Sequence, residues 1–166
     1  MGDAIVTAVL AAGWLAQAAA WLVALRSAGR RAAARREWPR EVLIRAGMLA
    51  LVVWALAAPR HPLPAVALAA LALLVFAAAH AEAIVARRQL GEGWGIGVDP
   101  RPGTEPVRRG LYSFLAHPIY YGMSFAALAQ YILLRNLPSL LLLGGTAAVA
   151  GVKGWQEGRR LRRNGG

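Results

Sequence analysis

The chain has 166 residues, of which 58% are hydrophobic, above the proportion of nearly half that is usual in soluble domains. It contains no cysteine, which excludes a disulfide framework, a thiolate metal site and a cysteine nucleophile. The net charge of +11 would suit nucleic acid, but no arginine stripe alternates with exposed aromatic residues, so we expect no nucleic-acid partner.

Five apolar runs predict an all-α integral membrane bundle of about five transmembrane helices, within one domain that comprises residues 1–166. A helix needs about 20 apolar residues to cross the hydrocarbon core, within a range of about 17–25. The first and third runs exceed this length, the second just reaches it, and the last two need flanking residues or local thinning of the bilayer. In chain order the predicted spans are residues 3–25, 42–58, 63–85, 119–134 and 137–152.

Basic residues gather in three segments between or beside the predicted spans. Residues 26–45 contain seven arginines, residues 87–109 contain five, and Lys153 with four arginines follows the last span. Because consecutive connections of a five-span chain alternate between the two sides of the membrane, these three segments lie on the same side. Only Arg60 and Arg135 lie in the connections on the other side. This positive-inside pattern predicts an N-terminus outside, a cytoplasmic C-terminus and basic residues that face anionic membrane lipids. A composition rich in arginine and alanine is typical of bacteria and indicates an inner membrane.

Two short connections predict antiparallel helix hairpins. The proline-rich segment PRHPLP, residues 59–64, joins the second and third spans, so we expect these spans to pair. Arg135 and Asn136 make a tighter turn before the fifth span, with Pro138 in its first turn, so the fourth and fifth spans form a second hairpin. Small residues four apart predict close helix contacts at Gly122 with Ala126 and at Gly144 with Ala148.

Among the polar residues inside the predicted spans, three are candidates for a specific role. His80 and Glu82 fall near the cytoplasmic end of the third span, and ionisable groups at membrane depth are functional candidates. Two other interpretations stay open, because these side chains can also snorkel to the interface or pair with Arg87. Gln130 lies deep in the fourth span, where we expect it to form a hydrogen bond between helices.

Residues 87–116 form a long predicted cytoplasmic loop before the fourth span. About thirty residues without an apolar run is long for so short a chain, and loops of this length are usually functional or disordered. Four glycines alternate from Gly91 to Gly97, but neither a Gly-Lys-Ser/Thr sequence nor a preceding strand accompanies them. These glycines therefore do not form a phosphate-binding loop.

A polar cluster follows at the start of the fourth span. Pro118 suits the first helical turn and leaves His117 at the helix N-terminus, whose free N–H groups can hold a carboxylate. Tyr120 and Tyr121 lie one turn further on, where their ring faces attract a cation. Glu157 follows the fifth span on the same side of the membrane and can hold an ammonium group. Together these features suit S-adenosylmethionine, a cationic, aromatic cofactor that carries an amino-acid zwitterion.

Three motifs in the C-terminal half resemble those of the isoprenylcysteine carboxyl methyltransferase family and its prokaryotic relatives. They are LGEGW at 90–94, RRGLYSFLAHPIYYG at 108–122, and a later glutamate that is followed four residues on by leucine. The family pattern is Leu-Gly-x-x-Trp, then Gly-x-Tyr-x-x-x-Arg-His-Pro-x-Tyr-x-Gly, then Glu-Glu-x-x-Leu. The matching residues are Leu90, Gly91, Trp94, Gly110, Tyr112, His117, Pro118, Tyr120, Gly122, Glu157 and Leu161.

The resemblance implies a membrane enzyme that takes S-adenosylmethionine from the cytoplasm and a lipophilic acceptor, a carboxylate or a hydroxyl compound, from the bilayer. It also implies that residues 90–116 cover the cofactor. A carboxylate needs no base, whereas a phenol would use His117 or Glu157. The candidate catalytic residues are Arg109 and His117. The candidate cofactor-binding residues are Leu90, Trp94, Gly110, Tyr112, His117, Pro118, Tyr120, Gly122 and Glu157, and we expect no metal site.

Two departures from the family pattern leave the acceptor open. Ala116 stands in place of the family's arginine, which removes a charge that could clamp a carboxylate, and Gly158 replaces the second glutamate. Arg108 or Arg109 can supply the missing charge. Equally, the acceptor can be something other than a carboxylate, or the chain can be a non-catalytic relative that retains the fold.

Other interpretations of the cluster also stay open. The histidine and tyrosines can form a helix cap and an aromatic belt at the headgroups, and the glutamate can be a counter-charge to the basic C-terminal run. A membrane reductase with a nicotinamide cofactor is a further alternative, although no dinucleotide fingerprint supports it. The sequence names neither the acceptor nor the oligomeric state.

Overall fold

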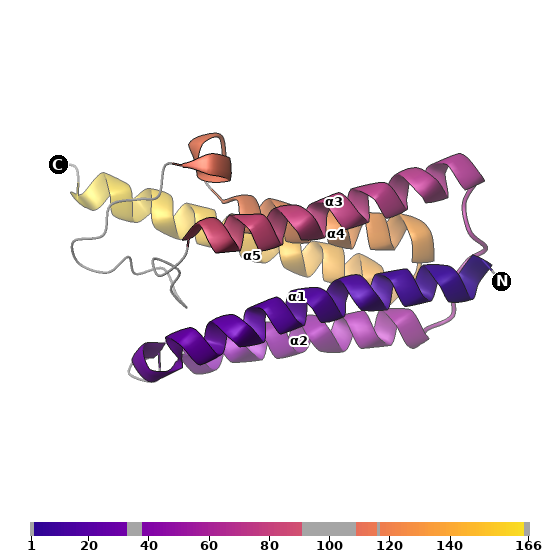
Figure 1. Cartoon of the computed structure of the whole chain (residues 1–166), viewed down its shortest axis with the longest axis horizontal. Helices are drawn as coiled ribbons and strands as arrows, with labels where there is room; N and C mark the ends of the chain where they lie inside the picture. The colour runs from indigo at the N-terminus through magenta and orange to yellow at the C-terminus, as the bar shows by residue number, and fades with distance from the viewer. Residues whose placement is uncertain (1, 33–37, 91–108, 116, 165–166) are drawn as a thin grey trace.

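The computed structural model describes the backbone of residues 2–32, 38–90, 109–115 and 117–164, with side chains in 2–23, 42–89, 109–115 and 117–155. Over these ranges the chain forms five α-helices and one short 3-10 helix, and no strand (Figure 1). The elements are α1 (Gly2–Ala32), α2 (Trp38–Ala57), α3 (Val66–Leu90), η2 (Gly110–Ser113), α4 (Pro118–Leu134) and α5 (Leu137–Asn164). The prediction of an all-α membrane bundle is confirmed.

Three helices are long and apolar enough to cross a membrane, through Gly2–Val23, Val66–Gln89 and Leu137–Trp155. The apolar part of α2, Val42–Ala57, is shorter, and α4 has 17 residues. Residues 87–90 form the last turn of α3 rather than part of the loop, because arginine, glutamine and leucine favour helix. Of the rest of the predicted loop, residues 109–115 are described and include η2, whereas residues 91–108 and Ala116 lie outside the described residues.

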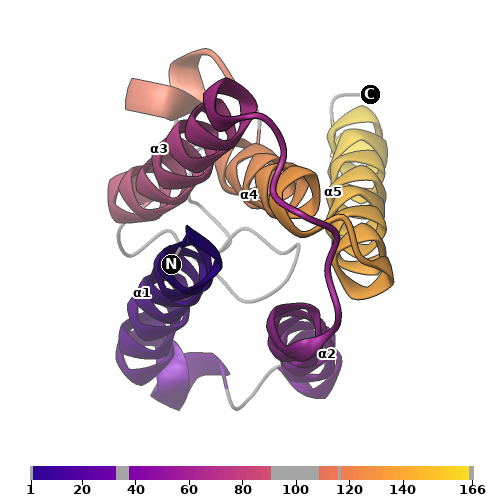
Figure 2. The same ribbon diagram turned by 90° about the vertical axis from the view of Figure 1, so that its right-hand side faces the viewer.

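The helices form a ring in the order α1, α3, α4, α5 and α2 when they are viewed along the bundle (Figure 2). The most extensive contacts join α3 with α4 and α4 with α5, so the predicted hairpin of the fourth and fifth spans is confirmed. The prediction that the second and third spans form a hairpin is wrong, because α2 packs against α5 and makes at most marginal contact with α3. The proline-rich connection does not reverse tightly; it crosses the end of the bundle, since proline favours an extended backbone.

Arg60 and Arg135 hold this connection in place. The Arg60 guanidinium donates to Thr7 Oγ1 of α1 at 2.8 Å, and the Arg135 guanidinium donates to the Pro62 carbonyl oxygen. Arg135 also ends α4 in the left-handed conformation, with φ of 46°. These two arginines, which lie at the end of the bundle opposite the basic segments, therefore have structural roles.

Asn136 joins the start of α5 to α2. Its side-chain Nδ2 donates to the Ala55 carbonyl oxygen of α2 at 2.8 Å, and its Oδ1 accepts from the Ser139 N–H at 3.1 Å. The second bond caps the N-terminus of α5. Because all three residues are buried, one asparagine fixes both the beginning of α5 and the α2–α5 contact.

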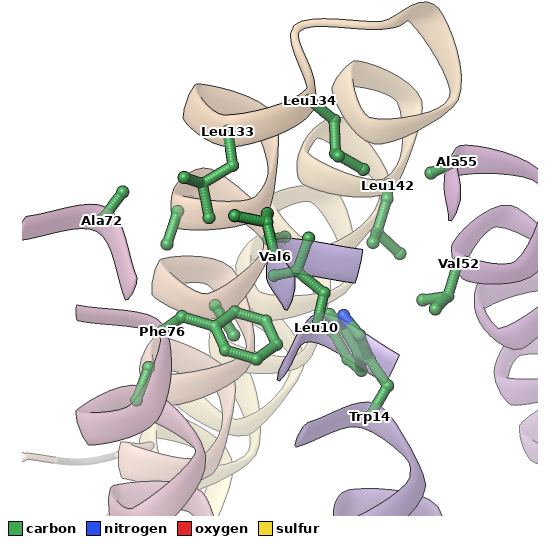
Figure 3. Close-up of a cluster of buried hydrophobic side chains, with 14 residues drawn as sticks. Val6, Leu10, Trp14, Val52, Ala55, Ala72, Phe76, Leu133, Leu134 and Leu142 are labelled. Carbon is green, nitrogen blue, oxygen red and sulfur yellow. The ribbon is translucent and has the colours of Figure 1, made fainter. Parts of the chain in front are cut away.

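The core combines aromatic and leucine side chains with a very close approach of α3 and α4. Figure 3 shows Val6, Leu10 and Trp14 of α1 pointing toward Phe76 of α3, with Leu133 of α4 nearby. Many valines and leucines on the outer faces are exposed as well, as expected of helices surrounded by lipid.

Small residues make the α3–α4 contact possible. Gly122 and Ala126 are buried, and an ideal Cβ on Gly122 would lie 2.7 Å from the Ala79 carbonyl oxygen. The predicted contact at Gly122 and Ala126 is therefore confirmed. The contact predicted at Gly144 and Ala148 is wrong, because both residues face outward and no described atom lies within 4 Å of a Cβ on Gly144.

Two of the polar residues inside the spans are buried between helices. Gln130 accepts a hydrogen bond from Trp14 Nε1 at 2.5 Å, which confirms the predicted bond between helices. His80 neither snorkels nor pairs with Arg87, because it is buried against Phe76 and Trp14. Arg87 instead donates to the Ala20 carbonyl oxygen of α1.

Candidate active site

The described motif residues lie where α3 ends and α4 begins, at the end of the bundle that we call the basic end because the arginine-bearing ends of α1, α3 and α5 and the start of α2 lie there (Figure 1). His117 is the N-cap residue of α4, and Pro118 is the first helical residue and is buried. The Tyr120 N–H donates to the His117 carbonyl oxygen at 3.1 Å. The His117 side chain forms no capping hydrogen bond with the described start of the helix. Pro118 has no N–H, and the Tyr121 N–H also donates to the His117 carbonyl oxygen, at 3.3 Å, so the Ile119 N–H and the partial positive charge of the helix start are what this end offers an anion.

The imidazole of His117 lies against the backbone of α5. An ideal Cβ on Gly154 would be 3.7 Å from His117 Cδ2 and 3.8 Å from Nε2, which is ordinary van der Waals contact. The ring centroid of Tyr120 lies 5.9 Å from that of His117, with the planes inclined by 45°. The position of Glu157 is one helical turn beyond Gly154, but its side chain lies outside those that the structure describes. The sequence interpretation required His117 of α4 to approach α5. The structure shows this approach at the level of the α5 backbone.

Gly110 and Tyr112 lie in η2, which is attached to the end of α3 through Gln89. The Leu111 N–H donates to Gln89 Oε1 at 2.9 Å. Gly110 has φ of 58°, in the left-handed region that favours glycine, and an ideal Cβ there would lie 2.5 Å from the Gln89 amide, which would have to move. Sequence reasoning missed Gln89, although its place directly before the LGEGW motif was a signal.

The structure describes the other predicted site residues to different extents. Arg109 is exposed, and its guanidinium donates a long hydrogen bond of 3.5 Å to the Gln89 carbonyl oxygen, so it lies beside the end of α3. Leu90 is the last residue of α3, but its side chain is not among those described, and Trp94 lies outside the described residues. Gly122 is one turn into α4 and faces α3, where its described role is close packing. The assignment of these residues to catalysis or cofactor binding stays a prediction.

Lys153 is a further residue that sequence reasoning missed. We assigned it to the basic residues that face lipid headgroups, but its side chain is buried, with an exposed fraction of 9%. It continues the inward face of α5 that Ser139, Leu142 and Thr146 define, all of which are buried. These four residues follow one another at intervals of three, four and seven positions, and this helical spacing in the sequence could have predicted that Lys153 faces inward. Lys153 therefore places a cation inside the basic end, next in sequence to the glycine that contacts His117.

Comparison with known protein families identifies the chain. A model of the isoprenylcysteine carboxyl methyltransferase (ICMT) family matches residues 68–152, slightly more than half of the sequence. The chain belongs to the ICMT family. The matched region begins in α3 and ends in α5, so the family similarity covers η2 and α4 and most of the two helices that flank them. Comparisons with curated proteins and with solved structures give no match.

Membership of the ICMT family and three long apolar helices together indicate an integral membrane protein of methyltransferase type. This membership favours methyl transfer over the nicotinamide-dependent reductase that the sequence left open. The family similarity includes the confirmed close contact of α3 with α4 and the turn at η2. Both features set the position of the N-terminus of α4, which carries the histidine.

Proposed function

We propose that the chain is an S-adenosylmethionine-dependent methyltransferase that methylates a lipophilic acceptor at the basic end of the bundle. The observation that carries the proposal is the position of the His117 imidazole beside α5 at Gly154, one turn before Glu157. This position brings together the N-terminus of α4, an imidazole and a helix that bears a carboxylate. The non-catalytic alternative does not require any of these groups to meet.

The groups at this end fit the amino-acid part of S-adenosylmethionine. The Ile119 N–H and the partial positive charge at the start of α4 suit its carboxylate. The ring of Tyr120 beside His117 suits a cation, and Glu157 would hold the ammonium group. When bound, the cofactor supplies a methyl group that is already activated on a sulfonium. The chain then has to orient the acceptor toward this methyl group and exclude water.

The type of acceptor determines what the protein side chains must do. A carboxylate is already ionised at neutral pH, so it requires a positive charge for positioning rather than a base. We assign that charge to Lys153, because the family's arginine is replaced by Ala116 and Lys153 is buried at the same end. A hydroxyl acceptor would instead give its proton to His117 as the bond to the methyl carbon forms.

We further propose that the basic end faces the cytoplasm of a bacterium, with the chain in the inner membrane. The end of α1, the start of α2, the end of α3 and the end of α5 lie at the basic end, and the N-terminus lies at the other (Figure 1). Lys and Arg at one end of the spans favour retention of that end inside the cell. A cysteine-accessibility experiment with single cysteines at positions 2 and 166 tests this orientation: position 2 should be labelled from outside the cell and position 166 only from the cytoplasm, and any other result contradicts it.

A binding titration tests the proposed cofactor site. The purified protein is titrated with S-adenosylhomocysteine, the demethylated product, in detergent or nanodiscs. His117→Ala should weaken binding by about tenfold or more, equivalent to about 1.4 kcal/mol. His61→Ala is the matched control, because His61 is exposed in the connection at the opposite end. Lack of affinity in the wild type, or equal affinity in the two variants, contradicts the proposal.

The role of Lys153 is tested with two acceptors. Lys153→Met keeps a long apolar side chain but removes the charge, so it should lower kcat/KM for a lipophilic carboxylic acid about tenfold or more. Methylation of a lipophilic phenol should change much less, because this reaction needs a base rather than a clamp. Equal losses with both acceptors would assign Lys153 a structural role only.

A further inference from the structure

A second polar site lies inside the bundle, away from the basic end. It consists of Trp14 from α1, His80 from α3 and Gln130 from α4. Gln130 follows His117 by 13 residues in α4, which corresponds to about 20 Å along the helix axis. This cluster is therefore separate from the proposed methyl-transfer site, and the inference below does not rest on methyl transfer.

Two side chains of the cluster are almost completely buried, and each has one polar atom in use. Gln130 has an exposed fraction of 0% and accepts from Trp14 Nε1 at 2.5 Å through its Oε1. His80 has an exposed fraction of 7%, and its Nδ1 lies 3.0 Å from the Phe76 carbonyl oxygen. A carbonyl oxygen can only accept, so Nδ1 is the donor; in neutral imidazole Nε2 then carries a lone pair.

The remaining polar atom of each side chain has no partner within the described part of the chain. These atoms are His80 Nε2, an acceptor, and Gln130 Nε2, a donor. Both side chains meet the same indole, because the His80 and Trp14 ring centroids are 5.0 Å apart and Gln130 Oε1 accepts a hydrogen bond from the indole N–H. Leaving a buried polar atom unsatisfied costs about 1–3 kcal/mol, and no bulk water reaches the hydrocarbon region to relieve it.

The unused atoms specify the chemistry of a ligand. A group that satisfies both must donate to His80 Nε2 and accept from Gln130 Nε2. A carboxylate or ketone only accepts and an ammonium only donates, whereas a hydroxyl does both. Apolar and aromatic side chains pack beside the cluster: the Phe76 ring lies 4.3 Å from that of His80 between centroids, with the planes inclined by 45°, and Leu10 belongs to the same core and is fully buried. We propose that Trp14, His80 and Gln130 form a binding site for one hydroxyl group within the membrane, from a lipophilic alcohol or from water.

Nitrogen NMR of labelled histidine tests this proposal in the intact protein in nanodiscs. The chain has only three histidines, so His80→Phe and His61→Ala assign the His80 signals. The 15N shift of Nε2 distinguishes a free lone pair from one that accepts a hydrogen bond. We expect the hydrogen-bonded shift in the wild type and a displacement toward the free value in Gln130→Leu, which removes the group that holds the hydroxyl oxygen.

Two additions identify the carrier of the hydroxyl. If the carrier is a lipophilic alcohol, addition of dodecanol should produce the hydrogen-bonded shift of His80 Nε2. Dodecanol should also raise the midpoint of thermal unfolding of the wild type but not of His80→Phe. Dodecane, which has no hydroxyl group, should cause neither change. If it is water, the bonded shift should appear without dodecanol, with magnetisation transfer from water to His80. A free Nε2 lone pair in every preparation, or a proton on Nε2, overturns the proposal. The wild-type spectrum decides this even if Gln130→Leu fails to fold.

Discussion

The closest approach of α3 and α4 gives the sharpest test of the fold, through Gly122→Ala. An ideal Cβ at position 122 lies 2.7 Å from the Ala79 carbonyl oxygen and 3.2 Å from Ala83 Cβ, whereas ordinary contact begins at 3.4 Å. Relief of the first overlap requires about 0.7 Å of separation between two backbones, because a carbonyl oxygen in a helix cannot rotate away. Overpacking of this kind costs about 1–3 kcal/mol.

Gly144→Ala provides the matched control. Among the described residues no atom lies within 4 Å of a Cβ at this position, which faces outward in the middle of α5. Alanine is a better helix former than glycine by up to about 1 kcal/mol, so this variant should equal or exceed the wild type in stability. The same chemical change should therefore have opposite effects at the two positions.

The assay is unfolding of the purified protein in mixed micelles, followed by helicity as denaturing detergent is added. Gly122→Ala should unfold at a lower fraction of denaturing detergent than the wild type, and Gly144→Ala at an equal or higher fraction. Because Gly122 lies one turn and a half beyond His117, we also expect Gly122→Ala to weaken binding of S-adenosylhomocysteine. If Gly122→Ala is as stable as Gly144→Ala, the inferred backbone contact does not exist.

Three further substitutions test individual hydrogen bonds. Asn136→Ala removes both the cap of α5 and its link to α2, so it should lower the unfolding free energy by about 1–3 kcal/mol in the same micelle assay; an unchanged value would refute the double role. Trp14→Phe leaves Gln130 Oε1 without its donor and should lower the unfolding free energy by about 1–2 kcal/mol. The double variant Trp14→Phe with Gln130→Leu should lose less unfolding free energy than the sum of the two single variants. Additive losses would show that the two side chains are not coupled. Gly110→Ala introduces a Cβ into the Gln89 amide at positive φ, so it should accelerate proteolysis near η2 without altering the micelle unfolding curve, and equal cleavage rates would contradict the attachment of η2 to α3.

The site was partly predictable from the sequence because its motif residues are polar or conformationally special in an otherwise apolar chain. Pro118 predicted the start of α4, and the short Arg135–Asn136 turn predicted that α5 returns to the same end. The contact of His117 with α5 follows from these two features. The sequence did not predict the attachment of η2 through Gln89, because this bond joins residues that are separated by about twenty positions.

The sequence by itself determined the five helices of the described residues, the starts of α4 and α5, and the family, since apolar length, proline and polar motifs act locally. It did not determine the ends of α1 and α5, which continue past the predicted spans to Ala32 and Asn164 because the polar residues there favour helix as well. Only the tertiary structure decided which faces of these helices point inward. In a soluble protein the polar face of a helix identifies its outside, but lipid is as apolar as the core, so an alanine- and leucine-rich helix has no distinctive outer face. For this reason the sequence misassigned the partner of α2, the outward position of Gly144 and the burial of Lys153, which depend on how five helices fit together.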